Sequence, residues 1–339
     1  MPNSTAQTAM KIEETSPPFV LVVILNWNSP GETLAAVASV LQMDYPNFRV
    51  TVVENGSTDD SATVLGQIED SRVQLLNSSE NRGYTGGCNL GFELALQSGA
   101  EYVWLFNNDA TTDAATLSSL VRTAQADPSI GLVSPVIASQ QEPSKVLNAG
   151  GFFDPQIPSY QSTKILSTAR RWASDCPNGI MLTGTALLVR VALIRKIGML
   201  DPAMFAYWED TEYSLRSTRA GYRNVVDFGS VIYHKERCAG TRAHEMKSHY
   251  WYYMARNEVR FWKKHAGFKQ RLRPLWWGYQ EQLRNLNRLR GNESSRQAVL
   301  AGLWHGWLNK GGAYRASFRM PKYLASAIEF HSSRWVPDP

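Results

Sequence analysis

The chain has 339 residues, 43% of them hydrophobic, so it can bury a full core and form one large domain with an appendage. This composition excludes a disordered protein, and no run of ~18 apolar residues is present to predict a spanning helix. Cys88, Cys176 and Cys238 lack zinc or redox spacing, and the N-terminus lacks the order of a signal peptide. Both features indicate a reducing cytosol.

The net charge of +5 is unevenly distributed. Residues 1–234 carry 15 Lys and Arg against 23 Asp and Glu, a net −8, whereas residues 235–339 carry 20 against 7, a net +13. The basic C-terminal part is also rich in Trp and Tyr. It suggests a polyanion or an anionic membrane surface as partner, and the alternative is a solvated helical face.

In chain order, residues 1–18 are polar and end in a proline pair, which predicts a disordered leader. Apolar runs predict strands over 20–25, 50–53, 73–76 and 102–106. Between them, helices are expected after a capping box at 29–32 with Pro30 at the first helical position, around 64–68, and over 86–98 before Gly99. This alternation predicts parallel strands in a doubly wound sheet.

The pattern changes after residue 126, where prolines and polar residues dominate as far as 177. Strands are expected over 131–134, 185–189 and 225–233, and helices over 191–197 and 209–220. We therefore expect a domain over 19–234, made of a nucleotide-binding half over 19–126 and an acceptor half over 127–234. A basic helical region over 235–339 follows.

The strand that ends at Phe106 is followed by Asn107-Asn108-Asp109. Ligands of open α/β sheets gather at the carboxyl ends of strands, and oxygen ligands there suit Mg²⁺ or Mn²⁺. The alternative is a turn that caps the helix expected near Asp113.

The second strand ends in Glu54-Asn55-Gly56, which outlines a nucleoside pocket: a carboxylate can accept from a base imide or a ribose hydroxyl. An ordinary turn is the alternative. Asn26 to Pro30 contain no G-x-G-x-x-G dehydrogenase fingerprint, and the chain has no G-x-x-x-x-G-K-[ST] loop. Farther on, Gly83, Gly86 and Gly87 permit a close backbone approach that could cradle a diphosphate, or they form only a tight turn.

Glu209 and Asp210 open the helix expected over 209–220. A carboxylate here could deprotonate an attacking hydroxyl, and its neighbour would raise its pKa by repulsion. The alternative is an acidic first turn that complements the helix dipole. His234 ends the last strand, where an imidazole suits Mn²⁺ or a phosphate oxygen, or is purely structural.

These motifs, in this order, resemble the family 2 glycosyltransferases of the GT-A fold, in particular bacterial rhamnosyltransferase-like members. The resemblance runs from about Val20 to His234 and rests on segments 24–28, 53–59, 81–89, 107–109 and 207–210. It implies the GT-A nucleotide-diphospho-sugar transferase fold, a Rossmann-like mixed α/β sheet, here with a helical, basic C-terminal extension. It also implies a nucleotide-sugar donor, a divalent Mn²⁺ or Mg²⁺, and inversion at the anomeric carbon.

Carried over residue by residue, the resemblance makes Asp210 the catalytic base beside Glu209 and places the metal at Asp109 with His234. It puts Asn89 on the first turn of a helix facing the site, and Asn178 and Gly179 near the acceptor-side loop. Acceptor contacts fall on Gly184, Thr185 and Trp208. Donor contacts fall on Asn26, Asn28, Glu54, Asn55, Gly56, Asn81, Gly83, Gly86, Gly87, Asn89, Asn107 and Asn108. Two positions depart from the family: Asn107 leaves one carboxylate where two can occur, and Glu54 replaces a more usual aspartate.

The expected function is transfer of a sugar, with rhamnose favoured, from a dTDP- or UDP-linked donor to a glycan or lipid-linked acceptor in bacterial surface polysaccharide or cell-wall assembly. A catalytically silent carbohydrate- or nucleotide-binding subunit is the alternative. A sugar nucleotidyltransferase would need a glycine- and arginine-rich loop after the first strand, and residues 26–30 offer none.

In the basic region, Arg256, Arg260, Lys263 and Lys264 share one predicted helical face, interleaved with Trp251, Tyr252, Phe261 and Trp262. This pattern is typical of an interfacial helix. It favours a cytoplasmic protein peripheral on the inner face of the plasma membrane. No motif supports nucleic acid as partner.

Overall fold

The computed structural model describes residues 16–154, 159–235 and 246–334. The expected leader over 1–18 therefore lies mostly outside the described residues. Its last two prolines are tied to the fold, because the Tyr45 hydroxyl donates to the Pro18 carbonyl and the Asn47 amide donates to that of Pro17.

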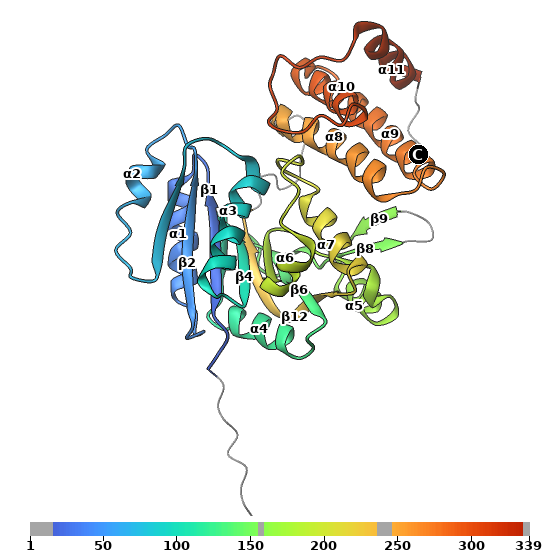
Figure 1. The fold of residues 1–339 in the computed structure, drawn as a ribbon. Helices are drawn as coiled ribbons and strands as arrows, with labels where there is room; N and C mark the ends of the chain where they lie inside the picture. The colour runs from blue at the N-terminus through green and yellow to red at the C-terminus, as the bar shows by residue number, and fades with distance from the viewer. Residues whose placement is uncertain (1–15, 155–158, 236–245, 335–339) are drawn as a thin grey trace, which may run out of the picture.

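A nine-stranded mixed sheet forms the centre of the molecule, in the order β3-β2-β1-β4-β11-β6-β12-β5, with β7 paired to β6 (Figure 1). β1, β2, β3 and β4 are parallel, whereas β11 runs antiparallel to both β4 and β6. The strands are β1 (Val20–Asn26), β2 (Phe48–Asn55), β3 (Val73–Ser78), β4 (Tyr102–Asn107), β5 (Ala110–Thr112), β6 (Ile130–Ser139), β7 (Val146–Asn148), β11 (Ala186–Arg190) and β12 (Arg223–His234).

The part of the chain before residue 235 also holds seven described α-helices and a small antiparallel sheet in the order β10-β8-β9. These strands are β8 (Gly151–Asp154), β9 (Ser159–Ser162) and β10 (Ile180–Met181), within a stretch whose polar residues did not predict a separate sheet. The helices are α1 (Pro30–Leu41), α2 (Ser61–Leu65), α3 (Gly83–Ser98), α4 (Thr116–Gln125), α5 (Leu166–Asp175), α6 (Val191–Ile197) and α7 (Glu209–Arg219).

The predicted helix boundaries at Pro30 and Gly99 are confirmed, whereas one predicted helix cap is not. Pro30 is the first residue of α1, and Gly99 ends α3 in the left-handed conformation with φ 77°. The capping box at the start of α1 is wrong, because the Ser29 side chain makes no capping hydrogen bond. The Thr33 hydroxyl instead donates to the Ser29 carbonyl.

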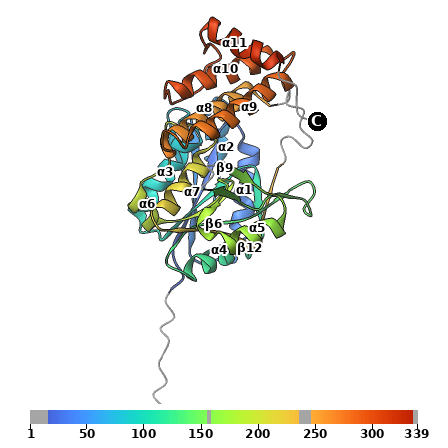
Figure 2. The same cartoon turned by 90° about the vertical axis from the view of Figure 1, so that its right-hand side faces the viewer.

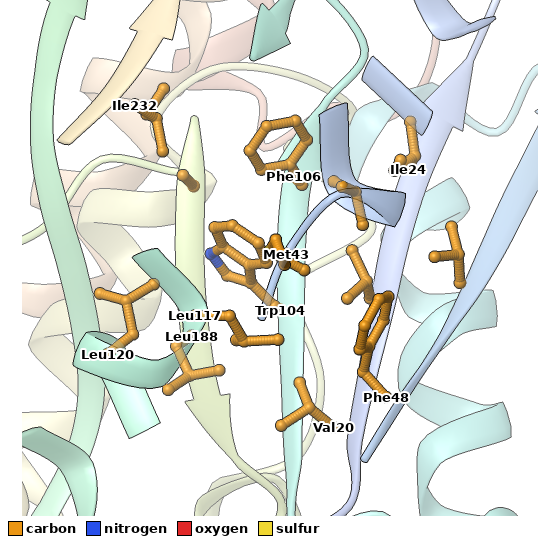
Figure 3. Close-up of a cluster of buried hydrophobic side chains, with 14 of the residues drawn as sticks. Val20, Ile24, Met43, Phe48, Trp104, Phe106, Leu117, Leu120, Leu188 and Ile232 are labelled. Atoms are coloured by element: carbon orange, nitrogen blue, oxygen red, sulfur yellow. The ribbon is translucent and has the colours of Figure 1, made fainter. Parts of the chain in front are cut away.

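Strand β4 shows how the sheet divides the core into two layers. Trp104 and Phe106 enter one apolar cluster, covered by α1 and α4, which Figure 3 shows in close-up. Val103 and Leu105 point to the opposite face, into a cluster covered by α3, α6 and α7. Alternating residues of a strand face opposite sides, and burying each such side chain stabilises the fold by about 1.5–3 kcal/mol.

Four helices follow the sheet: α8 (Ser248–His265), α9 (Leu272–Arg288), α10 (Glu293–Trp307) and α11 (Lys322–Arg334). Both views place them together on one side of the sheet domain, with α8 nearest to it (Figures 1 and 2). Phe261 and Trp262 of α8 pack into a cluster with Phe153, Met204 and Leu215 of the preceding part.

The interfacial reading of α8 is therefore wrong. Trp251, Tyr252, Phe261 and Trp262 are buried in protein contacts, and Arg256 is fully buried. The four rings and Arg256 therefore face neighbouring helices and the sheet domain, whereas Lys263 is half-buried and Lys264 is exposed. No helix among the described residues is both long and apolar enough to cross a membrane.

Candidate active site

The carboxyl ends of β1, β2 and β4 meet at one edge of the sheet because these neighbouring strands are parallel. Asn26 is in register with Glu54, and Leu25 is in register with Asn107. The predicted donor residues at these strand ends are thus brought together.

Asn26 joins two loops above this edge. Its Oδ1 accepts from the Thr33 hydroxyl at 2.7 Å, and its Nδ2 donates to Oγ of Ser57 at 3.2 Å. Asn108 Nδ2 donates to the same Thr33 hydroxyl at 3.1 Å. Asn26 and Asn108 therefore tie the ends of β1 and β4 to Thr33 of α1.

The loop after β2 is closed by its own carboxylate and by Asn28. Ser57 N donates to Oε1 of Glu54 at 2.8 Å, and Thr58 N donates to Oδ1 of Asn28 at 2.8 Å. Gly56 has φ 66°, and a Cβ there would overlap the backbone of Glu80. Glu54 is buried at 4% exposure, so its orientation is set before any ligand arrives.

Asn55 and Asn81 hold the start of α3. Asn55 Oδ1 accepts from Arg82 N at 3.1 Å, and its Nδ2 donates to the Gly83 carbonyl at 3.1 Å. Asn81 Oδ1 accepts from Gly83 N at 2.8 Å. Both amides therefore shape the loop that precedes the helix.

The glycines of this segment are required by protein packing. Gly83 has φ 72°, and a Cβ there would overlap Phe205; a Cβ on Gly87 would overlap Leu25 of β1. A Cβ on Gly86 would meet the side chain of Arg82. The close approach that glycine allows is to neighbouring chain segments, which is a sufficient reason for all three.

The expectation for Asn89 is corrected. Because α3 begins at Gly83, Asn89 lies beyond its first turn. Its Nδ2 donates to the Leu200 carbonyl and its Oδ1 accepts from Leu200 N, both at 3.0 Å. This buried amide therefore fastens α3 to the segment that begins at Leu200.

Asp109 and His234 meet at the open edge, where β12 pairs with β5. His234 Nε2 lies 3.0 Å from Oδ1 of Asp109, an ion-pair distance without the alignment of a hydrogen bond. The described residues contain no group of three or more His, Cys, Asp or Glu side chains that could hold a metal. One carboxylate and one imidazole nevertheless suit Mn²⁺, whose other ligands would then be oxygens of the donor and water.

Glu209 and Asp210 start α7 after a strained segment. Phe205, Tyr207 and Trp208 have φ of 63°, 66° and 70°, in the left-handed region that costs non-glycine residues about 1–3 kcal/mol each. Such strain persists only where surrounding contacts impose it, and it gathers at functional sites.

The Asp210 carboxylate is held from two sides. Oδ2 accepts from Gly184 N at 2.9 Å, and Oδ1 accepts from Thr211 N at 2.6 Å. The Gly184 carbonyl in turn accepts from the Tyr84 hydroxyl at 2.7 Å. Oδ1 also accepts from the Thr211 hydroxyl at 3.3 Å, so the lone pair that can still take a proton is on Oδ2.

Burial raises the pKa of Glu209, and the charge of Asp210 raises it further. Burial also raises the pKa of Asp210, partly offset by the hydrogen bonds from Gly184 and Thr211. Oε2 of Glu209 is buried without a hydrogen-bond partner among the described residues. A carboxylate pair with raised pKa values suits proton transfer near neutral pH.

The predicted acceptor residues surround this pair. Thr185 follows Gly184, and its carbonyl accepts from Asn107 N at 2.9 Å, which links the end of β4 to the segment that holds Asp210. The Trp208 ring is half-buried, with its centroid 5.9 Å from that of Tyr160 and 5.2 Å from that of Phe261. Gly179 is buried against Phe152, at the end of a short 3₁₀ helix (Pro177–Gly179).

Two buried side chains of α8 brace the strained segment. Asn257 Nδ2 lies 2.8–2.9 Å from the carbonyls of Met204, Ala206 and Tyr207. Arg256 Nη2 donates to the carbonyls of Ala203 and Met204. Sequence reasoning missed both roles and the role of Tyr84, and it assigned Arg256 to a basic surface instead.

The fold and this edge define a nucleotide-diphospho-sugar transferase of the GT-A type, with a central mixed sheet, polar strand ends and a carboxylate pair on α7. The chain belongs to glycosyl transferase family 2, whose family model matches residues 21–198. It is a glycosyltransferase.

The chain is similar to two curated relatives and to one solved structure. It is 29% identical over 244 residues to the N-acetylglucosaminyl-diphospho-decaprenol L-rhamnosyltransferase of Mycobacterium tuberculosis, covering 65% of this chain and 78% of that one. It is 26% identical over 219 residues to the galactofuranosyltransferase GlfT1 of the same organism, covering 63% and 67%. Its fold resembles that of the mannosyltransferase PcManGT from Pyrobaculum calidifontis, solved with GDP-Man and Mn²⁺, with a TM-score of 0.55 and 18% identity over 93% of this chain and 81% of that one.

Proposed function

We propose that the protein is an inverting glycosyltransferase that moves a sugar, with rhamnose favoured, from a dTDP- or UDP-linked donor to a lipid-linked glycan in bacterial cell-wall or surface-polysaccharide assembly. The observation that carries this proposal is the Asp210 carboxylate, fixed by Gly184 and Thr211 at the edge where the strand ends meet. The rhamnosyltransferase relative supports the choice of sugar and of a polyprenyl diphosphate acceptor. Work on such an acceptor would place the protein at the inner face of the plasma membrane.

The donor is proposed to lie along the ends of β1, β2 and β4. The carboxylate of Glu54 faces the base or ribose, and Asn28 and Gly56 shape the loop around it. Asp109 and His234 lie on the diphosphate side and would hold Mn²⁺ or Mg²⁺. A divalent ion supplies charge neutralisation to the leaving diphosphate.

The transfer itself needs one proton acceptor. The acceptor hydroxyl oxygen bonds to the anomeric carbon as its proton passes to Asp210, and the bond from that carbon to the diphosphate oxygen breaks. The nucleoside diphosphate leaves with the electron pair. Attack from the face opposite the leaving group inverts the configuration.

The test replaces Asp210 by Asn, which keeps size and removes the basic oxygen. With dTDP-rhamnose or a UDP-sugar and a polyprenyl-diphosphate acceptor, we expect turnover to fall by roughly 10² or more while donor affinity measured by calorimetry stays unchanged. The matched control is Asp70→Asn, a surface carboxylate paired with Arg72 just before β3, away from the strand ends.

Turnover of Asp210→Asn within a few-fold of the parent would place the base elsewhere. A parent protein that binds donor but transfers no sugar would instead favour the silent binding subunit. That alternative draws its support from Asn107, which leaves Asp109 as the single carboxylate of its segment.

A further inference from the structure

A cavity of about 240 Å³ opens between α8, α9 and α10, away from the strand ends. Its lining is mainly apolar and aromatic, with Leu272 and Trp276 from α9 and Trp307 from α10, and Glu258 of α8 is its one acidic residue. Sites for whole small-molecule ligands usually have about 300–1,000 Å³, so this one is small for a cofactor. It is a hollow in an apolar surface.

The surface around the hollow is exposed. Trp276 is 50% exposed and Trp307 54%, and Leu272 reaches 58%. Phe268 and Leu308, next to these residues in the chain, are also exposed. Contiguous exposed apolar side chains of this kind mark an interaction surface.

Positive charge accompanies the rings. Residues 259–280 contain six Lys or Arg and no Asp or Glu. The Lys263 ammonium lies 5.6 Å from the ring centroid of Trp307, and the guanidinium carbons of Arg271 and Arg273 lie 4.9 and 4.4 Å from those of Phe268 and Trp277. Burial lowers the pKa of Lys263, and the nearby charges of Arg271 and Arg260 lower it further.

The positive charge of this surface favours an anionic membrane over a second copy of the chain as its partner. A second copy of the chain would bring the same cations face to face, and repulsion opposes that contact. An anionic leaflet offers phosphates to the cations and hydrocarbon to the side chains between them. Trp rings favour the headgroup depth of a membrane, where cations between them can meet lipid phosphates.

We propose that the face formed by Phe268, Leu272, Trp276, Trp307 and Leu308 docks on an anionic phospholipid leaflet, with Lys263, Arg271 and Arg273 meeting the lipid phosphates. The exposed rings and leucines enter the headgroup region, and lipid fills the hollow. This inference extends the proposed function, because it names the surface that would bring a lipid-linked acceptor to the enzyme. Helix α8 connects the two places, since it lines the hollow with Val259 and braces the strained segment before α7 with Asn257.

The test is co-sedimentation of the full chain with vesicles of phosphatidylcholine alone or of equal parts phosphatidylcholine and phosphatidylglycerol. We expect binding to the anionic vesicles that weakens as salt is raised. Trp276→Ser with Trp307→Ser should weaken it at least about tenfold, as should Arg271→Gln with Arg273→Gln. The matched control is Ile165→Ser with Leu166→Ser, two exposed apolar residues at the start of α5, which should bind like the parent.

Three results would overturn the inference: equal pelleting with both vesicles, no pelleting with either, or tryptophan variants that bind like the parent. Loss of a dimer in the tryptophan variants, measured by light scattering, would identify a second copy as the occupant. Thermal midpoints of the variants check that they fold.

Transfer assays with a short-chain, water-soluble acceptor test the proposed function without membrane docking. The tryptophan variants should transfer sugar to it at the parental rate and fail only with acceptor embedded in vesicles. A parent that binds anionic vesicles but transfers to neither acceptor would sink the proposed function and leave the docking surface standing.

Discussion

At the scale of single residues, the peptide of Gly184 connects the two halves of the site. Its N–H holds the Asp210 carboxylate, and its carbonyl accepts from the buried hydroxyl of Tyr84 at the start of α3. A Cβ at position 184 would lie 3.4 Å from both the Asp210 Cβ and the Tyr84 hydroxyl oxygen. The proposed base is thus positioned from the donor side as well as from its own helix.

Asp109 gives a direct test of the proposed metal. Asp109→Asn should remove the metal-dependent part of donor affinity, because neutral amides cannot offset a divalent ion facing a diphosphate. The measurement is calorimetric titration of the nucleotide with Mn²⁺ and with chelator. Asp113→Asn is the control, a carboxylate that accepts from the Tyr233 hydroxyl just as Asp109 contacts the neighbouring His234. Donor affinity in the parent that chelator leaves unchanged would contradict the assignment.

Glu258 makes stability depend on pH. Burial raises the pKa of its carboxyl from 4.5 to about 7, Glu281 adds to the rise, and a hydrogen bond from Gln282 opposes it. Between pH 4.5 and about 7, the folded state therefore keeps a proton on Glu258 that the unfolded state has lost. The contribution of this group to stability is fully present below pH 4.5 and is lost as the pH rises to about 7.

We expect the free energy of unfolding to fall by about 3 kcal/mol across that window through this group, since one unit of pKa corresponds to about 1.4 kcal/mol. Glu258→Gln should flatten the profile measured by denaturant unfolding, and Glu293→Gln, on the exposed start of α10, should not. A parental slope that persists in Glu258→Gln would assign the proton to another group.

At the scale of elements, α8 braces the strained segment that precedes Glu209 and Asp210. Its Asn257 reaches the carbonyls of Met204, Ala206 and Tyr207 in the strained segment, and Arg256 also donates to that of Met204. The first turn of α7, with Glu209 and Asp210, follows directly. A helix outside the sheet domain is thereby part of the apparatus that aims the proposed base.

Asn257→Leu should lower turnover by roughly tenfold or more and destabilise the protein by about 1–3 kcal/mol, because the carbonyls lose their donor. Steady-state kinetics and denaturant unfolding measure the two effects. Asn285→Leu is the matched control, a buried amide on α9 bonded to Gln282, which should lose similar stability at parental turnover. If both variants lost turnover equally, the Asn257 contacts would serve only the stability of the fold.

At the scale of the whole molecule, the helical region and the sheet domain share a core. Phe261 and Trp262 of α8 lie in one cluster with Phe153, Met181, Met204 and Leu215. Glu212 of α7 is fully buried and bonded to Arg216, Lys264 and His265, so charged contacts cross the same boundary. We therefore propose that residues 19–234 and 235–339 act as one folding unit.

Accordingly, hydrogen exchange should give the same free energy of opening for amides of β4 and of α10, equal to that of global unfolding. Trp262→Ala should lower both by about 3–5 kcal/mol, because it empties a site in the shared cluster. Trp276→Ala is the control for loss of a ring that is half exposed. Destabilisation confined to α8–α11 would show two independent units.

The sequence by itself determined the features that depend on neighbours along the chain. Apolar runs placed β1, β2, β3 and β4, Gly99 marked the end of α3, and parallel pairing then put Asn26, Glu54 and Asn107 at one edge. The Glu209-Asp210 pair was visible because helix starts and acidic residues are local signals. These predictions needed only periodicity, spacing and the geometry of parallel strands.

Only the tertiary structure decided which of these side chains hold the protein together. Asn89 bonds to Leu200, 111 residues away, and Asn257 bonds to carbonyls about 50 residues before it. The face of α8 that carries Arg256 and Trp262 is buried, whereas Trp276 and Trp307 remain exposed. Periodicity shows that a helix has an apolar face, but whether that face meets protein or solvent depends on contacts between segments distant in sequence.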